Sequence, residues 1–218
     1  MADGPVVLFT NPDSFAGPSG IPALEADGAT VIGIDPEPGQ VEKVLETHGH
    51  IDVLINNDAF PAIRAPVEEA KLDDLRAGME AMLVTPFAMA QAVVPHMKGN
   101  KRGKILFITS ATPLNGLPNY SMYVTARGAA NSLALTLAKE LAASNIQVNA
   151  IGPNYVENPD YFPDELISDP ETLKRITKHI PLGRLGKPQE LAALITFLAS
   201  DKADWITAQV IPFSGGWA

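Results

Sequence analysis

The sequence contains no cysteine, and aromatic side chains make up only 6% of its 218 residues. The absence of cysteine excludes disulfide bonds, thiolate catalysis and zinc sites with cysteine ligands. The four histidines are not spaced so that two of them and a carboxylate would share one helix face, and we therefore expect no metal site.

Basic residues are also scarce, with 16 Lys and Arg against 25 Asp and Glu and a net charge of −9. This balance argues against a nucleic-acid partner, which needs clustered positive charge. The most apolar region, 81–97, is interrupted by two prolines and three polar residues, so we interpret it as a buried helix and expect no membrane span. The N-terminus has no basic segment followed by an apolar run, which favours a cytoplasmic protein.

Short runs rich in Val and Ile are the most regular feature of the chain, and most of them lack polar alternation. Such runs are typical of strands buried on both faces of a parallel sheet. We predict six strands, at 6–10, 29–35, 51–57, 104–110, 146–152 and 209–216.

Helical patterns separate these runs and predict βαβ crossovers. We expect a helix over 19–28, one or two helices within 66–99, a long helix over 120–143 and another over 188–199. The sequence therefore predicts an α/β protein: a single domain over 1–218 with a Rossmann-like, doubly wound parallel sheet in three α/β/α layers. Segment 153–181, rich in proline, is predicted to be a long functional loop with one short helix.

Several motifs resemble the short-chain dehydrogenase/reductase superfamily over nearly the whole chain. "FITSAT" ends the fourth strand, Tyr123 follows Ser110 by thirteen residues, and "AIGPN" ends the fifth strand. The stretch 181–216 is also similar to the C-terminal region of that superfamily. The resemblance implies an active site built on Ser110 and Tyr123.

The nucleotide loop departs from that superfamily's Thr-Gly-x-x-x-Gly-x-Gly pattern. In "TNPDSFAG" (10–17), Asn11 and Phe15 stand at the first two glycine positions, and only Gly17 remains. Glycines at such a loop let the backbone approach a pyrophosphate, and a Phe ring would occupy space near the cofactor. We therefore predict that no cofactor is bound. The alternative is a tolerant loop that still binds NAD.

Met82 stands where many dehydrogenases have a relay Asn, Asp58 follows the third strand in "NNDAF", and Arg127 replaces the usual Lys. The set of "T-N-x-x-x-F" from residue 10, "NND" from residue 56, Ser110, Tyr123 and Arg127 resembles the halohydrin dehalogenases. "GPNY" (152–155) and "DYFPDE" (160–165) are similar to the halide loop of that family. The resemblance implies a haloalcohol or epoxide substrate, a halide site where the nicotinamide would lie, and a homotetramer.

Tyr123 and Arg127 share one face of their helix, because they are four residues apart. A fixed positive charge beside a phenol favours the phenolate. We therefore assign Tyr123 as the base, with Ser110 binding the substrate oxygen. Asp58 would relay the proton towards solvent, although capping of a following helix is an alternative for it.

The predicted halide and substrate site lies in the loop after the fifth strand and includes Pro153. Its expected donors are backbone N–H groups around Asn154, Tyr155 and Val156. Its expected walls are aromatic rings, which offer positive edges to an anion. These are the rings of Phe15, Tyr155 and either Tyr161 or Phe162.

Two other functions remain open from the sequence. The first is an NAD(P)-dependent short-chain dehydrogenase with a degenerate loop, which Asp35 favours because an acid after the second strand can bind an adenine ribose. The second is a non-catalytic relative, against which the intact Ser110, Tyr123 and Arg127 argue. Trp217, near the C-terminus, is expected at a subunit interface.

Overall fold

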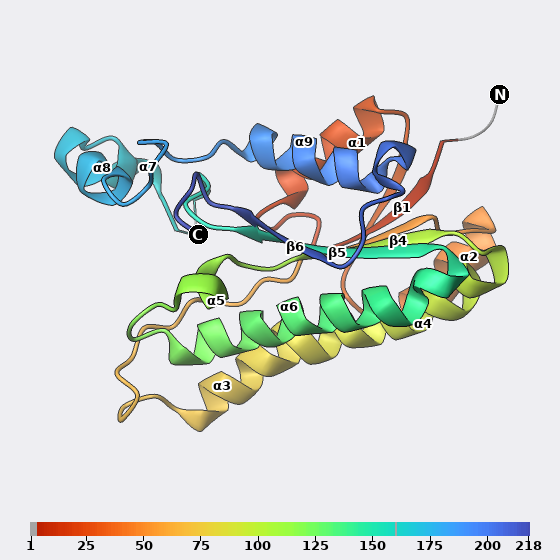
Figure 1. The fold of residues 1–218 in the computed structure, drawn as a ribbon, viewed down its shortest axis with the longest axis horizontal. Helices are drawn as coiled ribbons and strands as arrows, with labels where there is room; N and C mark the ends of the chain where they lie inside the picture. The colour runs from red at the N-terminus through yellow and green to blue at the C-terminus, as the bar shows by residue number, and fades with distance from the viewer. Residues whose placement is uncertain (1–3, 160) are drawn as a thin grey trace.

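All six predicted strands form, and they make one parallel sheet in the order β2-β1-β3-β4-β5-β6. The computed structural model describes residues 4–159 and 161–218 (Figure 1). The strands are β1 (Val6–Thr10), β2 (Thr30–Ile34), β3 (Val53–Asn56), β4 (Gly103–Ile108), β5 (Ile146–Pro153) and β6 (Gln209–Phe213). The predicted sixth strand was too long, because its last three predicted residues, 214–216, turn away from the sheet.

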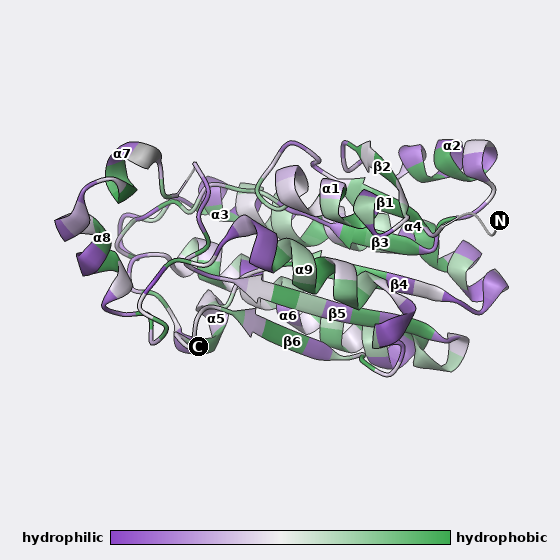
Figure 2. Cartoon of the chain, turned by 90° about the horizontal axis from the view of Figure 1, so that it is seen from above, coloured by the Kyte–Doolittle hydropathy of each residue, from purple (hydrophilic) through white to green (hydrophobic). Residues whose placement is uncertain are grey.

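Helices cover both faces of the sheet (Figure 1). On one face lie α1 (Gly17–Ala26) and α9 (Pro188–Ala199), and on the other lie α2 (Gly39–His48), α4 (Thr85–Asn100) and α6 (Ser121–Leu141). Each face buries its own apolar cluster, and Figure 2 shows apolar residues concentrated along the strands. Leu54 and its neighbour Ile55 point into opposite clusters, as the two-residue period of a strand requires. The predicted α/β fold with three layers is confirmed.

Several helices differ from the prediction. Within 66–99, helical structure begins only at α3 (Leu72–Met79) and continues through a π-helical turn, η1 (Glu80–Val84), into α4. Neither α2 nor the short α5 (Thr112–Asn115) was predicted. The sequence of α2 is mostly polar, and it buries only Val41 and Val44, so it carries little periodic signal.

The loop after β5 holds two short helices, α7 (Asp164–Ile167) and α8 (Pro170–Thr177), where we predicted one. Asp169 caps α8, because its carboxylate accepts the Thr172 N–H at 3.0 Å. Both helices project from the carboxyl edge of the sheet (Figure 1). This edge is where open α/β sheets place their ligands.

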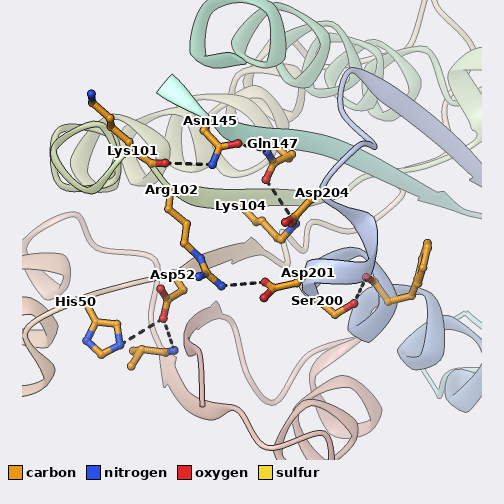
Figure 3. Close-up of polar contacts among 12 residues, drawn as sticks. His50, Asp52, Lys101, Arg102, Lys104, Asn145, Gln147, Ser200, Asp201 and Asp204 are labelled. Atoms are coloured by element: carbon orange, nitrogen blue, oxygen red, sulfur yellow. Dashed lines mark hydrogen bonds and ion pairs between the residues drawn. The ribbon is translucent and has the colours of Figure 1, made fainter. Parts of the chain in front are cut away.

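The amino edge of the sheet carries a cluster of ion pairs (Figure 3). Lys104 Nζ, on β4, lies 2.6 Å from Asp204 Oδ1, and Arg102 pairs with Asp201 at 2.8 Å. The side chain of Lys104 is only 7% exposed, so Asp204 compensates a buried charge. These pairs fasten η3 (Asp201–Ala203), the turn between α9 and β6, to the sheet.

The helical stretch Leu72–Asn100 has the length and apolar composition of a membrane-spanning helix, a test that core helices of globular proteins also pass. Met82, Met89, Val93 and Met97 are fully buried within this stretch. Met82 therefore has the core role expected for a thioether. Outward-facing apolar residues also occur on α4 and α6, among them Phe87 and Leu135.

Candidate active site

A cavity of about 900 Å³ opens at the carboxyl edge of the sheet. It is lined by residues that follow β1, β3, β4 and β5 and by the first turns of α6. All eleven residues selected from the sequence line it: Phe15, Asp58, Ser110, Tyr123, Arg127, Pro153, Asn154, Tyr155, Val156, Tyr161 and Phe162. The parallel sheet thus gathers segments that are up to 147 positions apart (Phe162 minus Phe15).

Ser110 follows β4, and its hydroxyl is held by Thr112. Thr112 N–H donates to Ser110 Oγ at 3.1 Å, and the two hydroxyl oxygens lie 2.9 Å apart. Gly152 of β5 permits the approach of the two strands here, because a Cβ on it would lie 2.8 Å from the carbonyl carbon of Ser110. Thr112 was not selected from the sequence, although "SAT" placed it two residues from Ser110.

Arg127 is 5% exposed and bridges the ends of two strands. Its Nη1 donates to the Ile108 carbonyl at 3.1 Å, and its Nη2 donates to the Asp58 carbonyl at 3.0 Å. The guanidinium lies 5.3 Å from the centroid of the Tyr123 ring. From the sequence we expected its fixed positive charge to favour the Tyr123 phenolate. The Arg127 guanidinium also donates two hydrogen bonds to two different carbonyls, a geometry that the single ammonium of Lys would not reproduce.

The charge of Arg127 is retained despite its burial. Burial opposes the charge, but Tyr123 and Asp58 outweigh this effect and raise the pKa of Arg127 above its ordinary value. The site therefore holds a permanent cation next to the phenol of Tyr123.

Asp58 is 4% exposed, and neither of its carboxylate oxygens has a hydrogen-bond partner among the described residues. Burial raises its pKa to about 7, against the lowering effect of Arg127. The alternative that Asp58 caps the next helix is wrong, because α3 begins only at Leu72. Asp58 is thus a carboxyl group that titrates near neutral pH within the cavity.

The former glycine positions keep a left-handed backbone although they no longer hold glycine. Asn11 has φ 49° and Phe15 has φ 34°. The Asn11 amide donates to the Asn57 carbonyl at 2.9 Å, and the Asn57 amide donates back to the Asn11 and Ser14 carbonyls at 3.0 and 2.8 Å. The loop is therefore clamped to the end of β3, and the Phe15 ring lines the cavity.

The start of α1 offers few N–H groups to a phosphate. Gly17 N–H donates to the Ser14 carbonyl at 2.8 Å, Ser14 N–H donates to Asn11, and Pro18 has no N–H. Pro12 also fills the space beside β2, since a Cβ on Gly33 would lie 2.8 Å from it. These residues do not fit a dinucleotide pyrophosphate.

Hydrogen bonds within the fold already use some of the predicted anion donors in the loop after β5. Asn154 N–H donates to the Phe213 carbonyl at 3.0 Å, so this N–H is already used within the fold. Tyr155, at φ 56°, donates its N–H to the Asn154 side chain at 3.1 Å. Within 4–159 and 161–218, the N–H of the buried Val156 has no hydrogen-bond partner. A buried N–H without a partner at a cavity wall is suited to an anion.

Aromatic rings surround this loop. The Tyr155 centroid lies 6.2 Å from that of Phe162 and 5.9 Å from that of Trp217, whose ring is edge-on. Burial raises the pKa of Tyr155, which favours its neutral phenol. Tyr161 and Phe162 both line the cavity, where the sequence left the choice between them open. Trp217 thus contacts the loop of its own chain, and its expected place at a subunit interface stays a prediction.

Acidic and histidine side chains do not gather into a metal site here. The described part of the chain has no group of three or more His, Cys, Asp or Glu placed to hold a metal ion. Asp35, which could have marked a ribose site, is exposed after β2.

The topology of the sheet and the placing of Ser110 and Tyr123 define a class of protein that the sequence comparisons also identify. Residues 39–218 match the family described as enoyl-(acyl carrier protein) reductase. The chain is 38% identical over 177 residues to 3-oxoacyl-(acyl-carrier-protein) reductase FabG of Thermotoga maritima, covering 81% of this chain and 70% of that enzyme. It spans 56% of a tropinone reductase homolog of Arabidopsis thaliana, at 31% identity over 81% of this chain. The chain belongs to the short-chain dehydrogenase/reductase superfamily.

Solved structures indicate a narrower relationship. A structure described as a dehalogenation enzyme is 46% identical with a TM-score of 0.95, covering 99% of both chains. Halohydrin dehalogenase HheC, bound to ethyl (2S)-oxiran-2-ylacetate, is 35% identical with a TM-score of 0.87, covering 97% of this chain and 96% of HheC. An NAD+-bound xylitol dehydrogenase, 23% identical with a TM-score of 0.90 over 99% of this chain and all of its own, shares the fold. The likeness to halohydrin dehalogenases suggested by the sequence motifs is therefore confirmed.

Proposed function

We propose that this protein is a cofactor-independent halohydrin dehalogenase. It converts vicinal haloalcohols to epoxides with release of halide and a proton, and in reverse it opens epoxides with small anions. The observation that carries this proposal is the clamped loop in which Asn11 and Phe15 keep the left-handed backbone of the lost glycines. With that loop closed to a pyrophosphate, the cavity at Ser110 and Tyr123 is left for substrate alone.

In the proposed reaction, Tyr123 accepts the proton of the substrate hydroxyl, while Ser110 hydrogen-bonds the same oxygen. The substrate oxygen forms a bond to the adjacent carbon as the carbon–halogen bond breaks, and the halide leaves with the bonding electrons. The nucleophile belongs to the substrate, so no covalent enzyme intermediate forms. The proton passes from Tyr123 towards Asp58, whose pKa of about 7 suits proton transfer at neutral pH.

The leaving halide needs donors as its charge grows. Support for an anion site beside Tyr155 comes from the unpaired N–H of Val156 and from the rings of Tyr155 and Phe162. The permanent charge of Arg127 contributes a favourable field. Tyr155, Val156 and Phe162 lie in the loop after β5 and Arg127 lies in α6, so the electrophilic carbon would lie between these groups and Ser110.

The rival function is that of an NAD(P)-dependent reductase, since several sequence relatives are named reductases. For the wild-type protein we expect no saturable thermal shift with NAD(H) or NADP(H), because the loop at 11–17 lacks the pyrophosphate cradle. We expect steady halide release from chlorohydrins, followed by a halide-sensitive electrode. A saturable shift with either nucleotide would reject the dehalogenase. Failure to release halide from any of several vicinal haloalcohols would favour a non-catalytic protein.

We also propose that the chain forms a homotetramer, in part through the outer faces of α4 and α6. Phe87 on α4 is 46% exposed and Leu135 on α6 is 37% exposed, so association would bury apolar surface. Light scattering on the 23.2 kDa chain should give about four times that mass, and Phe87→Asp should lower it. A monomeric wild-type protein at micromolar concentration would contradict the assembly.

A further inference from the structure

One buried residue of α6 is polar and takes no part in the proposed reaction. Asn131 is only 6% exposed, and Arg127 lies four residues before it on the same face of the helix. The other buried residues of α6 are apolar: Met122, Ala126, Ala130, Ala134, Ala138 and Leu141. Asn is a weak helix former, and burying an amide is unfavourable unless it forms hydrogen bonds. The position of Asn131 therefore indicates a use for its amide.

The nitrogen of this amide is bound to the backbone of Ser110. Asn131 Nδ2 donates to the Ser110 carbonyl at 3.3 Å, while Thr112 holds the Ser110 hydroxyl at 2.9 Å. Because the peptide unit is planar, fixing the carbonyl also fixes the plane that follows Ser110. Ser110 lines the cavity and Asn131 does not. Asn131 thus holds, from behind, the residue that binds the substrate oxygen in the proposed reaction.

The oxygen of the same amide is matched by an atom of Arg127. Side chains in a helix lean towards its N-terminus, so Asn131 leans onto Arg127. Both Nη atoms of Arg127 donate to backbone carbonyls. Its Nε, a donor, and Asn131 Oδ1, an acceptor, are buried and have no hydrogen-bond partner among the described residues. Buried polar groups are normally paired with protein or with ordered water, and a donor and an acceptor one helical turn apart suit one bridging water.

We propose that Asn131 is a positioning residue for the reaction, which holds Ser110 directly and Arg127 through one buried water. The inference rests on the proposed dehalogenase activity. Asn131 Nδ2 fixes the Ser110 backbone, so that the Ser110 hydroxyl meets the substrate oxygen. The water accepts from Arg127 Nε and donates to Asn131 Oδ1, so that the guanidinium keeps its place beside the Tyr123 ring. Asn131 itself touches no substrate atom and transfers no proton.

The test replaces the amide of Asn131 by two methyl groups on the same branched frame. Asn131→Leu should lower kcat for halide release from 1-chloro-2-propanol by about ten- to a hundredfold, since small displacements of positioned groups act at this scale, and should change KM by less than about threefold. Asn149→Leu is the matched control, because Asn149 is 1% exposed and does not line the cavity. Its amide donates to the Ile206 carbonyl at 2.8 Å and accepts the Gln209 N–H at 3.1 Å. This control should lower the thermal midpoint and leave kcat unchanged.

A crystal structure of the wild-type protein separates failure of this inference from failure of the proposed function. One ordered water should lie about 3 Å from both Arg127 Nε and Asn131 Oδ1, whether or not halide is ever released. If Asn131→Leu does not fold, Asn131→Ala, which cannot overpack the core, should show the same loss of kcat.

Three results would overturn the positioning role. They are a wild-type crystal structure without this water, a folded Asn131 variant with wild-type kcat, and an equal loss of kcat in Asn149→Leu. A wild-type protein that holds the water and releases no halide from any vicinal haloalcohol would reject the dehalogenase and leave the hold of Asn131 on Arg127 intact.

Discussion

Tyr123→Phe is expected to lower halide release from chlorohydrins by about 10²- to 10⁴-fold, the range that a positioned general base contributes. The variant removes only the phenolic oxygen, so the hydroxyl proton of the substrate has no acceptor at that place. The ring itself remains, and with it the packing of the Arg127 guanidinium 5.3 Å from the ring centroid. We therefore expect the loss to fall on kcat and the thermal midpoint to change little.

The control for this variant is Tyr120→Phe, which removes the hydroxyl of another tyrosine that lines the same cavity. Its halide release should stay within a few-fold of wild type. If Tyr123→Phe kept more than a tenth of wild-type activity, Tyr123 would not be the base. A Tyr123→Phe protein that unfolded at a much lower temperature would indicate a structural role instead.

Asp58→Asn is expected to change the pH dependence of stability. Burial raises the pKa of Asp58 from 3.8 to about 7, so the folded state binds this proton more tightly than the unfolded state. The stabilisation of the folded state by the bound proton is fully present below about pH 4 and is lost as the pH rises through 7. The shift corresponds to on the order of 4 kcal/mol in the free energy of unfolding. The Asn variant lacks this pH dependence. Between pH 4 and 8, its free energy of unfolding should therefore rise relative to that of wild type by up to that amount.

Urea unfolding at several pH values measures this difference. Asp201→Asn is the matched control, because its carboxylate is exposed and pairs with Arg102 at the opposite edge of the sheet. That variant should follow the wild-type pH profile. Parallel profiles for wild type and Asp58→Asn would show that Asp58 titrates as an ordinary carboxyl group. Halide release by Asp58→Asn should also fall, since the amide cannot take a proton from Tyr123.

The strands were the most predictable part of the fold. The strand β4 (Gly103–Ile108) is buried at every position, and a parallel strand covered on both faces has such a mostly apolar run whatever lies around it. The helix α2 was missed because only Val41 and Val44 are buried in it. The π-helical turn was missed because no local residue signal distinguishes it from the α-helices on either side.

The gathering of the candidate site was also predictable, because parallel strands bring their carboxyl ends to one edge. The hydrogen bonds within it were not. Asn154 was predicted as an anion donor, yet its N–H is used by Phe213 on β6, which a reading of the loop alone does not reveal.

By itself, the sequence determined the layered α/β architecture and the loss of glycines at 11 and 15, because periodicity and residue type are local properties. Only the tertiary structure decided how those positions are used. Asn11 and Asn57, 46 residues apart, clamp the loop, and Arg127 joins the ends of β3 and β4. Such partners depend on which segments the folded sheet brings within hydrogen-bonding distance. The chain neighbours of Asn11, Asn57 and Arg127 do not encode which segments these are.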